Sequence, residues 1–387
     1  MDSTERKIED PRAEIDAIDS ELLRLVNRRA EIALQVGEAK AKIDTSLCDP
    51  GRERDVLARL SAVNTGPFDD QSIVNIFQRI IDESLHLQQR TFRTQSDKTE
   101  LKSGGRIDGK ARVAFLGEAG TFSEVAALGI LGDGCETVSC PTFEDLFAAI
   151  DSGKADLIVT PLENSLIGSV RRCVDLLLAS DLTIVGEIVL PVSHFLIGYE
   201  GATLETLETV ESHPAALAQC TRFFAAHPHL QRVSSDDTAG SVRRAVESAD
   251  VTRAGIGGRR AAAIYGGTII REHIEDHAEN YTRFALLSAD ANATEGSKIS
   301  LVVRLKHQPG ALHAALRPFV RRGIDLSKIE SLPIRESPGE FNFYLDLQAP
   351  PIEAELRGAL DEIAEQTEAV RFLGRYSTVH LPADHEV

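Results

Sequence analysis

Two cationic side chains occupy positions where an apolar helical stripe would otherwise continue. Arg29 follows Leu25 by four residues and precedes Ile32 by three, so it lies in the register of that stripe. Lys40 comes 11 residues later, about three helical turns, and therefore projects from nearly the same face. A buried guanidinium needs a partner, and the alternatives are an arginine that snorkels to solvent or pairs within its own helix. The pattern predicts that two cations point into one core.

Two further segments carry polar residues at helical spacing. Asp49, Arg52 and Glu53 are three and four residues apart, so they share one face of a helix. Ser84 and Gln88 share a face of another helix in the same way. Taken one at a time, each set is typical of an ordinary surface pair.

The element that positions the cations is predicted to be one long helix. Apolar spacing over residues 11–43 indicates this helix, with Asp10 as its N-cap and Pro11 as its first residue. At about 1.5 Å per residue it spans about 50 Å, more than a domain of about 90 residues covers by itself, so we expect a partner chain. Arg12 lies 17 residues before Arg29, about 260° around the helix, and reaches a shared pocket only in that partner.

Breakers divide the N-terminal part of the chain. Further helices are expected over about residues 49–63 and 69–89, separated by Asn-Thr-Gly-Pro at 64–67. Residues 91–110 are polar, contain paired glycines and lack periodicity, which indicates a linker. The first domain, residues 1–90, is therefore predicted to be all α.

Residues 11–90 resemble the all-helical chorismate mutase family in the phrases PRAEIDAID, NRRAEIALQVGEAK, DPGRERDVLARL and FQRIIDESLHLQQ. The resemblance implies an intertwined three-helix dimer in which Arg29 and Arg12 of the other subunit hold the two carboxylates of chorismate. It implies that Lys40 and Gln88 donate to the ether oxygen. The remaining implied substrate contacts are Asp49, Arg52, Glu53 on the ring hydroxyl, and Ser84. Such a Claisen rearrangement needs only a compact conformer and stabilisation of developing charge.

After residue 110 short β-rich runs alternate with helix-like stretches, the pattern of an α/β domain. Residues 111–188 and 189–275 form two similar halves, and the chain returns near Asn280, so we expect two lobes with a cleft between them. The run ENYTRF at 279–284 comes at this return. By itself the run is typical of an edge strand with an exposed threonine.

Residues 111–290 resemble the prephenate dehydratase family in five ordered motifs: FLGEAGTFSE (115–124), TPLENSLIGSV (160–170), ESHPAALAQC (211–220), DDTAGS (236–241) and NYTRF (280–284). The resemblance implies a two-lobed fold like that of periplasmic binding proteins. The family's essential threonine corresponds to Thr282, which would assist departure of the substrate hydroxyl. Matching cleft positions are Asn164, Ser212, Gln219 and Thr238. Further candidates are Glu163, His213 and Arg283, the last as a substrate contact.

Backbone groups in this domain are also candidates for binding carboxylates. The segments 118–121 and 164–165 precede helix-like stretches, where N–H groups can face an anion. The run GIGG at 255–258 matches part of a dinucleotide-binding motif, but Arg260 stands at its third glycine position. A nicotinamide-dependent dehydrogenase is therefore disfavoured, and no cofactor or metal is expected.

From residue 298 the order strand, helix, strand, strand, helix, strand predicts a ferredoxin-like α+β domain. Residues 297–376 resemble an ACT domain, which implies amino-acid binding at a subunit interface and feedback inhibition by phenylalanine. The turn Gly310, Ala311 and Leu312 matches the turn that holds the ligand backbone. Glu330 and Ser331, also predicted to bind the effector, belong to a second signature, in which Leu332 replaces the usual arginine. A module that only dimerises is the alternative.

Composition restricts the compartment and the partners. A formal net charge of -18 argues against nucleic acid and anionic membranes. The charged start and the lack of a run of about 20 apolar residues predict a soluble cytoplasmic protein. The 5 cysteines include no CxxC pair, so neither disulfides nor zinc are indicated. We expect chorismate and prephenate as substrates, phenylalanine as effector, and a homodimer or larger homo-oligomer; an amino-acid-responsive binding protein is the main alternative.

Overall fold

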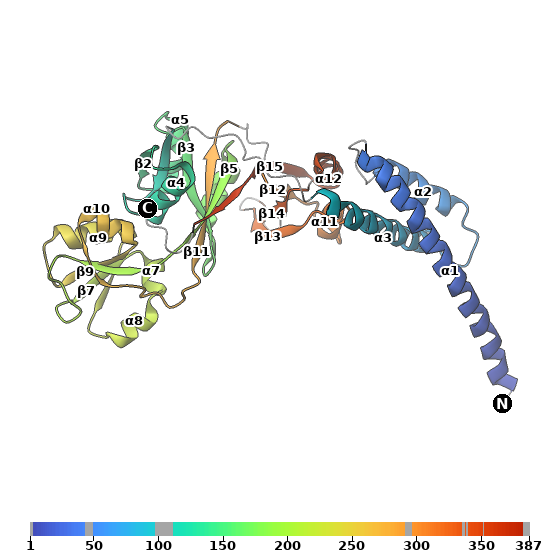
Figure 1. The fold of residues 1–387 in the computed structure, drawn as a ribbon, viewed down its shortest axis with the longest axis horizontal. Coiled ribbons are helices and arrows are strands. Elements are labelled where there is room, and N and C mark those ends of the chain that lie inside the picture. Colours follow the sequence, from blue (N-terminus) through green and yellow to red (C-terminus); the bar gives the residue numbers. More distant parts are fainter. Residues whose placement is uncertain are drawn as a thin grey trace. The chain divides into compact units, whose positions relative to one another are not determined.

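The computed structural model describes most of the 387 residues. The described residues are 3–42, 49–96, 111–290, 296–334, 337, 340–350 and 352–381. Contacts divide the molecule into one unit of Met1–Lys102 and Leu301–Phe372 and another of Ser103–Ser300 and Leu373–Val387. Each is described by itself, and Figure 1 labels their elements.

The N-terminal part is helical, as predicted. Its helices are α1 (Ser3–Lys42), α2 (Pro50–Ala62) and α3 (Asp70–Ser96), and α1 and α2 both pack on α3. The predicted start at Asp10 was wrong, because α1 begins at Ser3 and Pro11 lies inside it. Helix α3 also continues through the first residues of the predicted linker to Ser96. Residues 97–110 of that linker lie outside the described residues.

Helix α2 starts where the sequence provides a cap. The Asp49 carboxylate accepts the backbone N–H of Arg52 at 3.0 Å, and Pro50 follows at the first helical position. Between α2 and α3 the Asn64 side chain donates to the Phe68 carbonyl at 2.8 Å, which closes the turn at the predicted breaker. Local side-chain chemistry therefore sets both ends of this connection.

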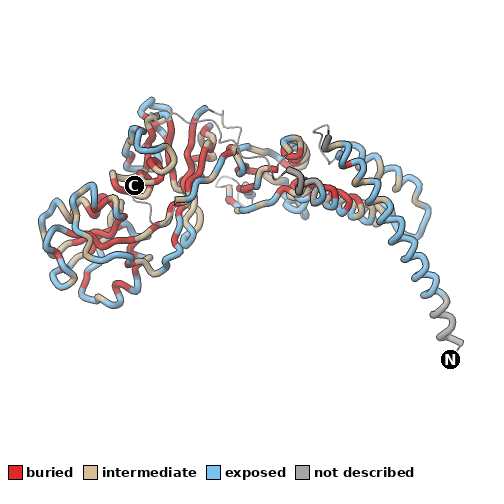
Figure 2. The backbone as a smooth tube through the Cα atoms, viewed as in Figure 1, coloured by how far each residue is buried: buried red, intermediate tan, exposed pale blue. Residues whose placement is uncertain are grey.

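An apolar stripe on α1 is left about half exposed by the residues that the structure describes. Its members are between 48% and 54% exposed: Ile15, Ile18, Leu22, Leu25, Ile32 and Val36. Figure 2 shows the exposed stretch along α1 in pale blue. The sequence-based expectation that the domain leaves part of its first helix uncovered is confirmed.

The first lobe of the α/β domain is built on a mixed sheet. Its strand order is β16-β5-β11-β3-β1-β2, with β4 paired to β3. Strands β1, β2 and β3 are parallel, whereas β11 is antiparallel to both β3 and β5. The elements are β1 (Arg112–Leu116), α4 (Phe122–Leu131), β2 (Glu136–Cys140), α5 (Phe143–Asp151), β3 (Leu157–Asn164), β4 (Gly168–Ser169), α6 (Arg171–Ala179), β5 (Thr183–Pro191), β11 (Tyr281–Ser288) and β16 (Thr378–His380).

The second lobe has its own sheet, of order β10-β6-β9-β7-β8. Helix α9 packs closely on β9 of this sheet. At Gly255 on β9 there is no room for a side chain, since a Cβ there would lie 2.7 Å from the backbone nitrogen of Val242 on α9. The elements are β6 (Phe195–Gly198), β7 (Thr209–Ser212), α7 (Pro214–Ala218), α8 (Thr221–Ala226), β8 (Gln231–Ser234), α9 (Thr238–Glu247), β9 (Arg253–Gly257), α10 (Arg259–Tyr265) and β10 (Thr268–Arg271). Two α/β halves with a returning strand near Asn280 are therefore confirmed.

The C-terminal part has the predicted βαββαβ order. Its elements are β12 (Lys298–Arg304), α11 (Ala311–Arg321), β13 (Leu326–Pro333), β14 (Phe341–Gln348), α12 (Glu353–Gln366) and β15 (Ala369–Tyr376). The sheet order β13-β14-β12-β15 is that of ferredoxin-like folds. Within the described residues, no helix is both long and apolar enough to cross a membrane.

A short strand after this domain was not predicted. Strand β16 returns to the first lobe, where it runs parallel to β5 and places Thr378 opposite Glu187. Leu381 then packs against the apolar core of the same lobe. The sheet of the first lobe is therefore completed by residues that follow the C-terminal domain.

Candidate active sites

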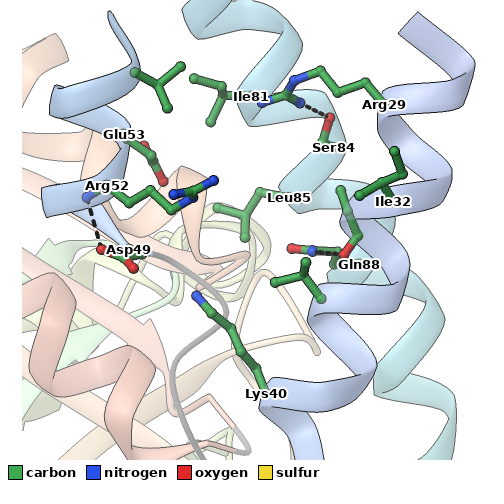
Figure 3. Close-up of a pocket in the computed structure, with 13 residues that line it drawn as sticks. Arg29, Ile32, Lys40, Asp49, Arg52, Glu53, Ile81, Ser84, Leu85 and Gln88 are labelled. Atoms are coloured by element: carbon green, nitrogen blue, oxygen red, sulfur yellow. Dashed lines mark hydrogen bonds between the residues drawn. The ribbon is translucent and has the colours of Figure 1, made fainter. Parts of the chain in front are cut away.

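A pocket of about 260 Å³ opens among the helices of the N-terminal part. Figure 3 shows side chains from α1, α2 and α3 converging on it. Its polar lining consists of Arg29, Lys40, Asp49, Arg52, Glu53, Ser84 and Gln88. Its apolar lining consists of Ile32, Ala33, Val36, Val56, Ile81 and Leu85. The structure thus brings together every residue predicted for this site except Arg12.

Arg29 is held by neutral groups of the neighbouring helix. Its Nη1 donates to Ser84 Oγ at 2.7 Å and to the Ile80 carbonyl at 3.5 Å. No carboxylate pairs with it among the described residues, and burial lowers the pKa of its guanidinium. The alternatives of a snorkelling or intrahelically paired arginine do not hold. Arg29 instead provides a half-buried cation that pairs with neutral groups and with no carboxylate in the described part of the chain.

Other pocket residues already make structural contacts. The Gln88 amide nitrogen donates to the Ala33 carbonyl of α1, and Ser84 Oγ donates to the Ile80 carbonyl at 2.7 Å. The Asp49 carboxylate caps α2 from the edge of the pocket. The first contact joins α3 to α1, and the second fixes the Ser84 side chain on α3. Both side chains are therefore held in place before a ligand binds.

Arg12 lies outside the pocket. Its side chain is exposed on α1, and it is not part of the pocket lining. This agrees with the helical geometry that prevents Arg12 and Arg29 from serving one pocket from one chain.

Thr282 lies at one end of a polar network in the α/β domain. It stands opposite Asn164 in the pairing of β11 with β3, and its side chain is nearly buried. Asn164 Nδ2 donates to Thr282 Oγ1 at 3.0 Å and to Asn280 Oδ1 at 2.7 Å. Asn280 Nδ2 in turn donates to Gln219 Oε1 at 3.0 Å. Asn164, Gln219 and Thr282, which the motifs had suggested separately, thus belong to one network.

Three other predicted positions have no described contact with Thr282. The fully buried Ser212 hydroxyl donates to the Ile256 carbonyl at 2.7 Å. His213 is exposed, and its Nδ1 accepts the Ala215 N–H as the N-cap of α7. Thr238 is the first residue of α9. The motif positions therefore divide into a connected network and residues that support the second lobe.

Arg283 is compensated in a way that Arg29 is not. Its guanidinium lies 2.6 Å from Glu163 Oε2 and 2.7 Å from Glu187 Oε2. Glu187 is only 1% exposed and also binds Lys298 Nζ at 2.9 Å and the Thr378 hydroxyl at 2.9 Å. The charge of Arg283 is therefore already compensated within the domain before any substrate binds.

Four of the six backbone donors proposed for carboxylates are already occupied. The N–H groups of Glu118, Gly120, Thr121 and Ser165 each donate within the domain. Their acceptors are Asp237 Oδ2, Glu124 Oε2, Glu118 O and Tyr281 O. The expectation that these four groups face a substrate was therefore wrong, because the acidic side chains and carbonyls of the turns satisfy them first.

In the C-terminal domain, Gly310 adopts a φ of 81° before α11, and a Cβ there would meet open space. Leu312 is exposed next to this turn. On β13, Glu330 pairs with Lys328 at 3.3 Å and Ser331 is exposed. Leu332 is only 3% exposed, so the residue that replaces the usual arginine fills the core. No described contact joins the turn to Glu330 or Ser331.

A helical pocket lined by cations and a two-lobed α/β domain with a polar network define a chain with two separate candidate active sites. The chorismate mutase type II family matches residues 11–89, and the prephenate dehydratase family matches residues 113–292. These matches correspond to the helical part and to the α/β domain.

Full-length relatives combine the same parts. The bifunctional chorismate mutase/prephenate dehydratase of Neisseria gonorrhoeae is 34% identical over 369 residues, covering 95% of this chain and 96% of the relative. The chain belongs to this family of bifunctional chorismate mutases/prephenate dehydratases. It is accordingly an enzyme with a chorismate mutase domain and a prephenate dehydratase domain.

Solved structures resemble the C-terminal two thirds. Prephenate dehydratase from Arthrobacter aurescens, in complex with L-Phe, is 30% identical with a TM-score of 0.63, covering 69% of this chain and 90% of that chain. GqqA, described as a novel type of quorum-quenching acylase, is 31% identical with a TM-score of 0.63, covering 69% of this chain and 98% of that chain. Because one fold supports different reactions, the reaction must be argued from the residues of the site.

Proposed function

We propose that the helical pocket rearranges chorismate to prephenate. The observation that carries this proposal is the half-buried guanidinium of Arg29, which has no carboxylate partner among the described residues. A partly desolvated cation attracts a carboxylate more strongly than a solvated one does. Arg29 would hold one carboxylate of chorismate, and Arg12 of a second chain would hold the other.

Lys40 and Gln88 are proposed to stabilise the breaking C–O bond. Both line the pocket with Arg29, and Gln88 has a second amide hydrogen besides the one it donates to α1. Negative charge develops on the ether oxygen as this bond breaks, so donors already in place lower the barrier. The proposed further contacts are Asp49, Arg52, Glu53 on the ring hydroxyl, and Ser84.

The α/β domain is proposed to convert prephenate to phenylpyruvate. As the ring carboxylate leaves as CO₂, its bonding electrons enter the ring and expel the hydroxyl, which departs as water after taking up one proton. Thr282 Oγ1 accepts from Asn164, so its own hydrogen is available to the leaving oxygen. Gln219 is proposed to bind the substrate beside it. Ser212, Thr238 and Arg283 remain predicted cleft positions.

Both reactions are tested by supplying chorismate to the purified chain and measuring prephenate and phenylpyruvate. The wild-type chain should form phenylpyruvate, whereas Thr282→Ala should accumulate prephenate because only the second reaction uses that hydroxyl. Thr268→Ala, at an exposed threonine on β10, is the matched control and should behave as wild type. A Thr282→Ala chain that forms phenylpyruvate at the wild-type rate would remove Thr282 from the mechanism.

The mutase is proposed to work as a homodimer. The exposed apolar stripe of α1 supports this, because large contiguous apolar surfaces on soluble proteins mark interaction sites. A second α1 laid on the stripe would also bring its own Arg12 toward the pocket of the first chain. A cytoplasmic location stays a prediction.

Residues 297–376 are proposed to be an ACT domain that binds phenylalanine and inhibits the dehydratase. The βαββαβ topology supports this, as does the L-Phe complex of the Arthrobacter aurescens enzyme. Gly310, Ala311 and Leu312 would bind the amino-acid backbone, and Glu330 and Ser331 would be further contacts of the effector. Because an effector works through its differential affinity for two states, the loss of an arginine at Leu332 should weaken the coupling more than the binding.

Titration with phenylalanine tests this proposal. Equilibrium binding and the rate on supplied prephenate are measured on the same sample, with Gly310→Val as the variant that strains the positive-φ turn. Wild type should bind and be inhibited, and Gly310→Val should bind more weakly. No binding at millimolar phenylalanine would leave the domain as a dimerising module, while binding without inhibition would assign the defect to the coupling step.

A further inference from the structure

The chain crosses between the lobes of the α/β domain twice, and both crossings meet at one carbonyl group. The first crossing, residues 192–194, ends in His194, and the second, residues 272–280, ends in Asn280. His194 Nε2 lies 2.8 Å and Asn280 Nδ2 lies 3.0 Å from Gln219 Oε1. The backbones of the crossings are also joined, since an N–H of the first donates to the Asn280 carbonyl at 2.8 Å.

Two backbone N–H groups set the direction of every hydrogen bond in this network. Asn164 Oδ1 accepts from the N–H groups of Leu166 at 3.0 Å and Ile167 at 3.2 Å. A backbone N–H can only donate, so the oxygen of the Asn164 amide must face these groups. Its nitrogen must therefore face Thr282 and Asn280.

The same logic extends to the lobe on the other side. Because Asn164 donates to Asn280 at 2.7 Å, Asn280 must present its oxygen there and its nitrogen to Gln219. Gln219 then accepts through its oxygen and keeps its own NH₂ group for another acceptor. His194 must donate from Nε2, because the Gln219 oxygen cannot.

These hydrogen-bond directions define the protonation state of the His194 imidazole. The ring is 2% exposed, and Nδ1 has no hydrogen-bond partner among the described residues. Burial lowers its pKa, although the nearby Glu275 carboxylate, which accepts the His194 backbone N–H at 2.8 Å, opposes that shift. The ring of Phe122 packs edge-on against it. A neutral imidazole protonated at Nε2 satisfies all of these contacts.

We infer that His194 and Asn280 are positioning residues of the dehydratase, which orient Gln219 and Thr282 as hydrogen-bond donors toward the substrate. The inference rests on the proposed roles of Thr282 and Gln219. With both lone-pair positions of the Gln219 oxygen in use, its NH₂ group is directed away from the network. With Thr282 accepting from Asn164, its hydroxyl hydrogen is free for the leaving group. Prephenate offers carboxylate and hydroxyl oxygens, which are acceptors for these donors.

An isosteric change at Asn280 tests the polarity directly. An ionised carboxylate in Asn280→Asp still accepts from Asn164 but cannot donate to Gln219. We expect kcat for prephenate to fall about 5- to 150-fold, the cost of an unmet buried hydrogen bond. On acidification the carboxyl group of the Asn280→Asp variant becomes protonated and donates again, so its activity relative to wild type should rise. Asn280→Ala is the matched control, which should lose activity without recovery at low pH.

The imidazole is tested by a pair of variants. Glutamine places its NH₂ group near the position of Nε2, so His194→Gln should retain most of the activity, whereas His194→Leu should lose about as much as Asn280→Ala. Nitrogen-15 spectra of histidine-labelled protein should show the His194 signal, assigned by its loss in His194→Gln, with the proton on Nε2. Denaturant unfolding of each variant checks that its α/β domain is folded, because mutase activity reports only on the separate helical part.

The outcomes separate this inference from the proposed function. A proton on Nδ1, or an Asn280→Asp chain that stays as inactive as Asn280→Ala at every pH, would overturn the positioning role. Full activity of Asn280→Asp at neutral pH would do the same. A folded wild-type chain without dehydratase activity would instead refute the proposed function.

Discussion

Replacing Arg29 with methionine would distinguish a catalytic cation from a structural one. Methionine keeps an unbranched apolar stem and removes only the guanidinium. That group contacts Ser84 Oγ at 2.7 Å and the Ile80 carbonyl at 3.5 Å and has no carboxylate partner among the described residues. Folding would lose these hydrogen bonds but would also avoid partial burial of a charge. We therefore expect the free energy of unfolding to change by about 1 kcal/mol or less.

Catalysis should respond far more strongly than stability. Removing one member of a desolvated, hydrogen-bonded charge pair costs about 2–5 kcal/mol of binding. Because about 1.36 kcal/mol corresponds to a factor of ten in rate, kcat/KM for chorismate should fall about 30- to 5000-fold. The dehydratase rate on supplied prephenate should not change, since that site lies in another domain.

The assay compares chorismate consumption, prephenate consumption and denaturant unfolding in the same preparations. Arg28→Met is the matched control, because Arg28 is the exposed neighbour and pairs only with Glu31 at 2.7 Å among the contacts described for it. It should leave all three quantities close to wild type. The reasoning is refuted if Arg29→Met keeps kcat/KM within about threefold of wild type, or if it destabilises the fold by several kcal/mol.

Three further predictions follow from burial and from the proposed dimer. Arg12→Ala and Arg29→Ala chains, each inactive as mutases, should regain activity when mixed, because one pocket of the mixed dimer contains both arginines; no recovery despite demonstrated subunit exchange would argue for sites within single chains. Burial lowers the folded-state pKa of His194 below its ordinary value of 6.5, so on acidification the unfolded chain binds more protons and the free energy of unfolding should decrease. Unfolding curves measured at and below pH 6.5 should show a smaller decrease in the free energy of unfolding for His194→Gln than for wild type. An equal decrease in the two proteins would exclude His194 as the cause. Burial raises the pKa of Cys173 and Cys220 to about 12, so both should react with a thiol reagent only in the unfolded protein, and rapid labelling of either in the native state would contradict this.

Periodicity was sufficient to predict most of the fold. The helical spacing, the two α/β halves and the βαββαβ order are all local patterns, and the structure confirms each. The start of α1 was misplaced because Pro11, although typical of a first turn, lacks only one N–H and is tolerated inside a long helix here. Strand β16 was missed because Thr378–His380 is too short to show alternation, and its pairing with β5 is a long-range contact.

The candidate sites were predictable to different extents. Helical spacing placed Arg29 and Lys40 on one face, but the family resemblance was needed to assign the residues of the other two helices to the same pocket. The occupied N–H groups near Gly120 could not be foreseen, because their acceptors come from folding rather than from the turn sequence. Asn280 stood inside a recognised motif without a role, and His194 carried no local signal at all. Their proposed role depends on a hydrogen bond to Gln219, which only the folded domain brings next to them.

The pairing of β16 with β5 limits where the protein can be truncated. Because β11 and β16 belong to one sheet, the ferredoxin-like domain is inserted within the dehydratase rather than appended to it. A chain truncated near residue 290 would uncover the edge of β5, which invites aggregation. It would also leave the buried Glu187 without Lys298 and Thr378. Losing the ferredoxin-like domain during evolution would therefore require rebuilding this sheet edge of the dehydratase, which favours inheritance of the two domains together.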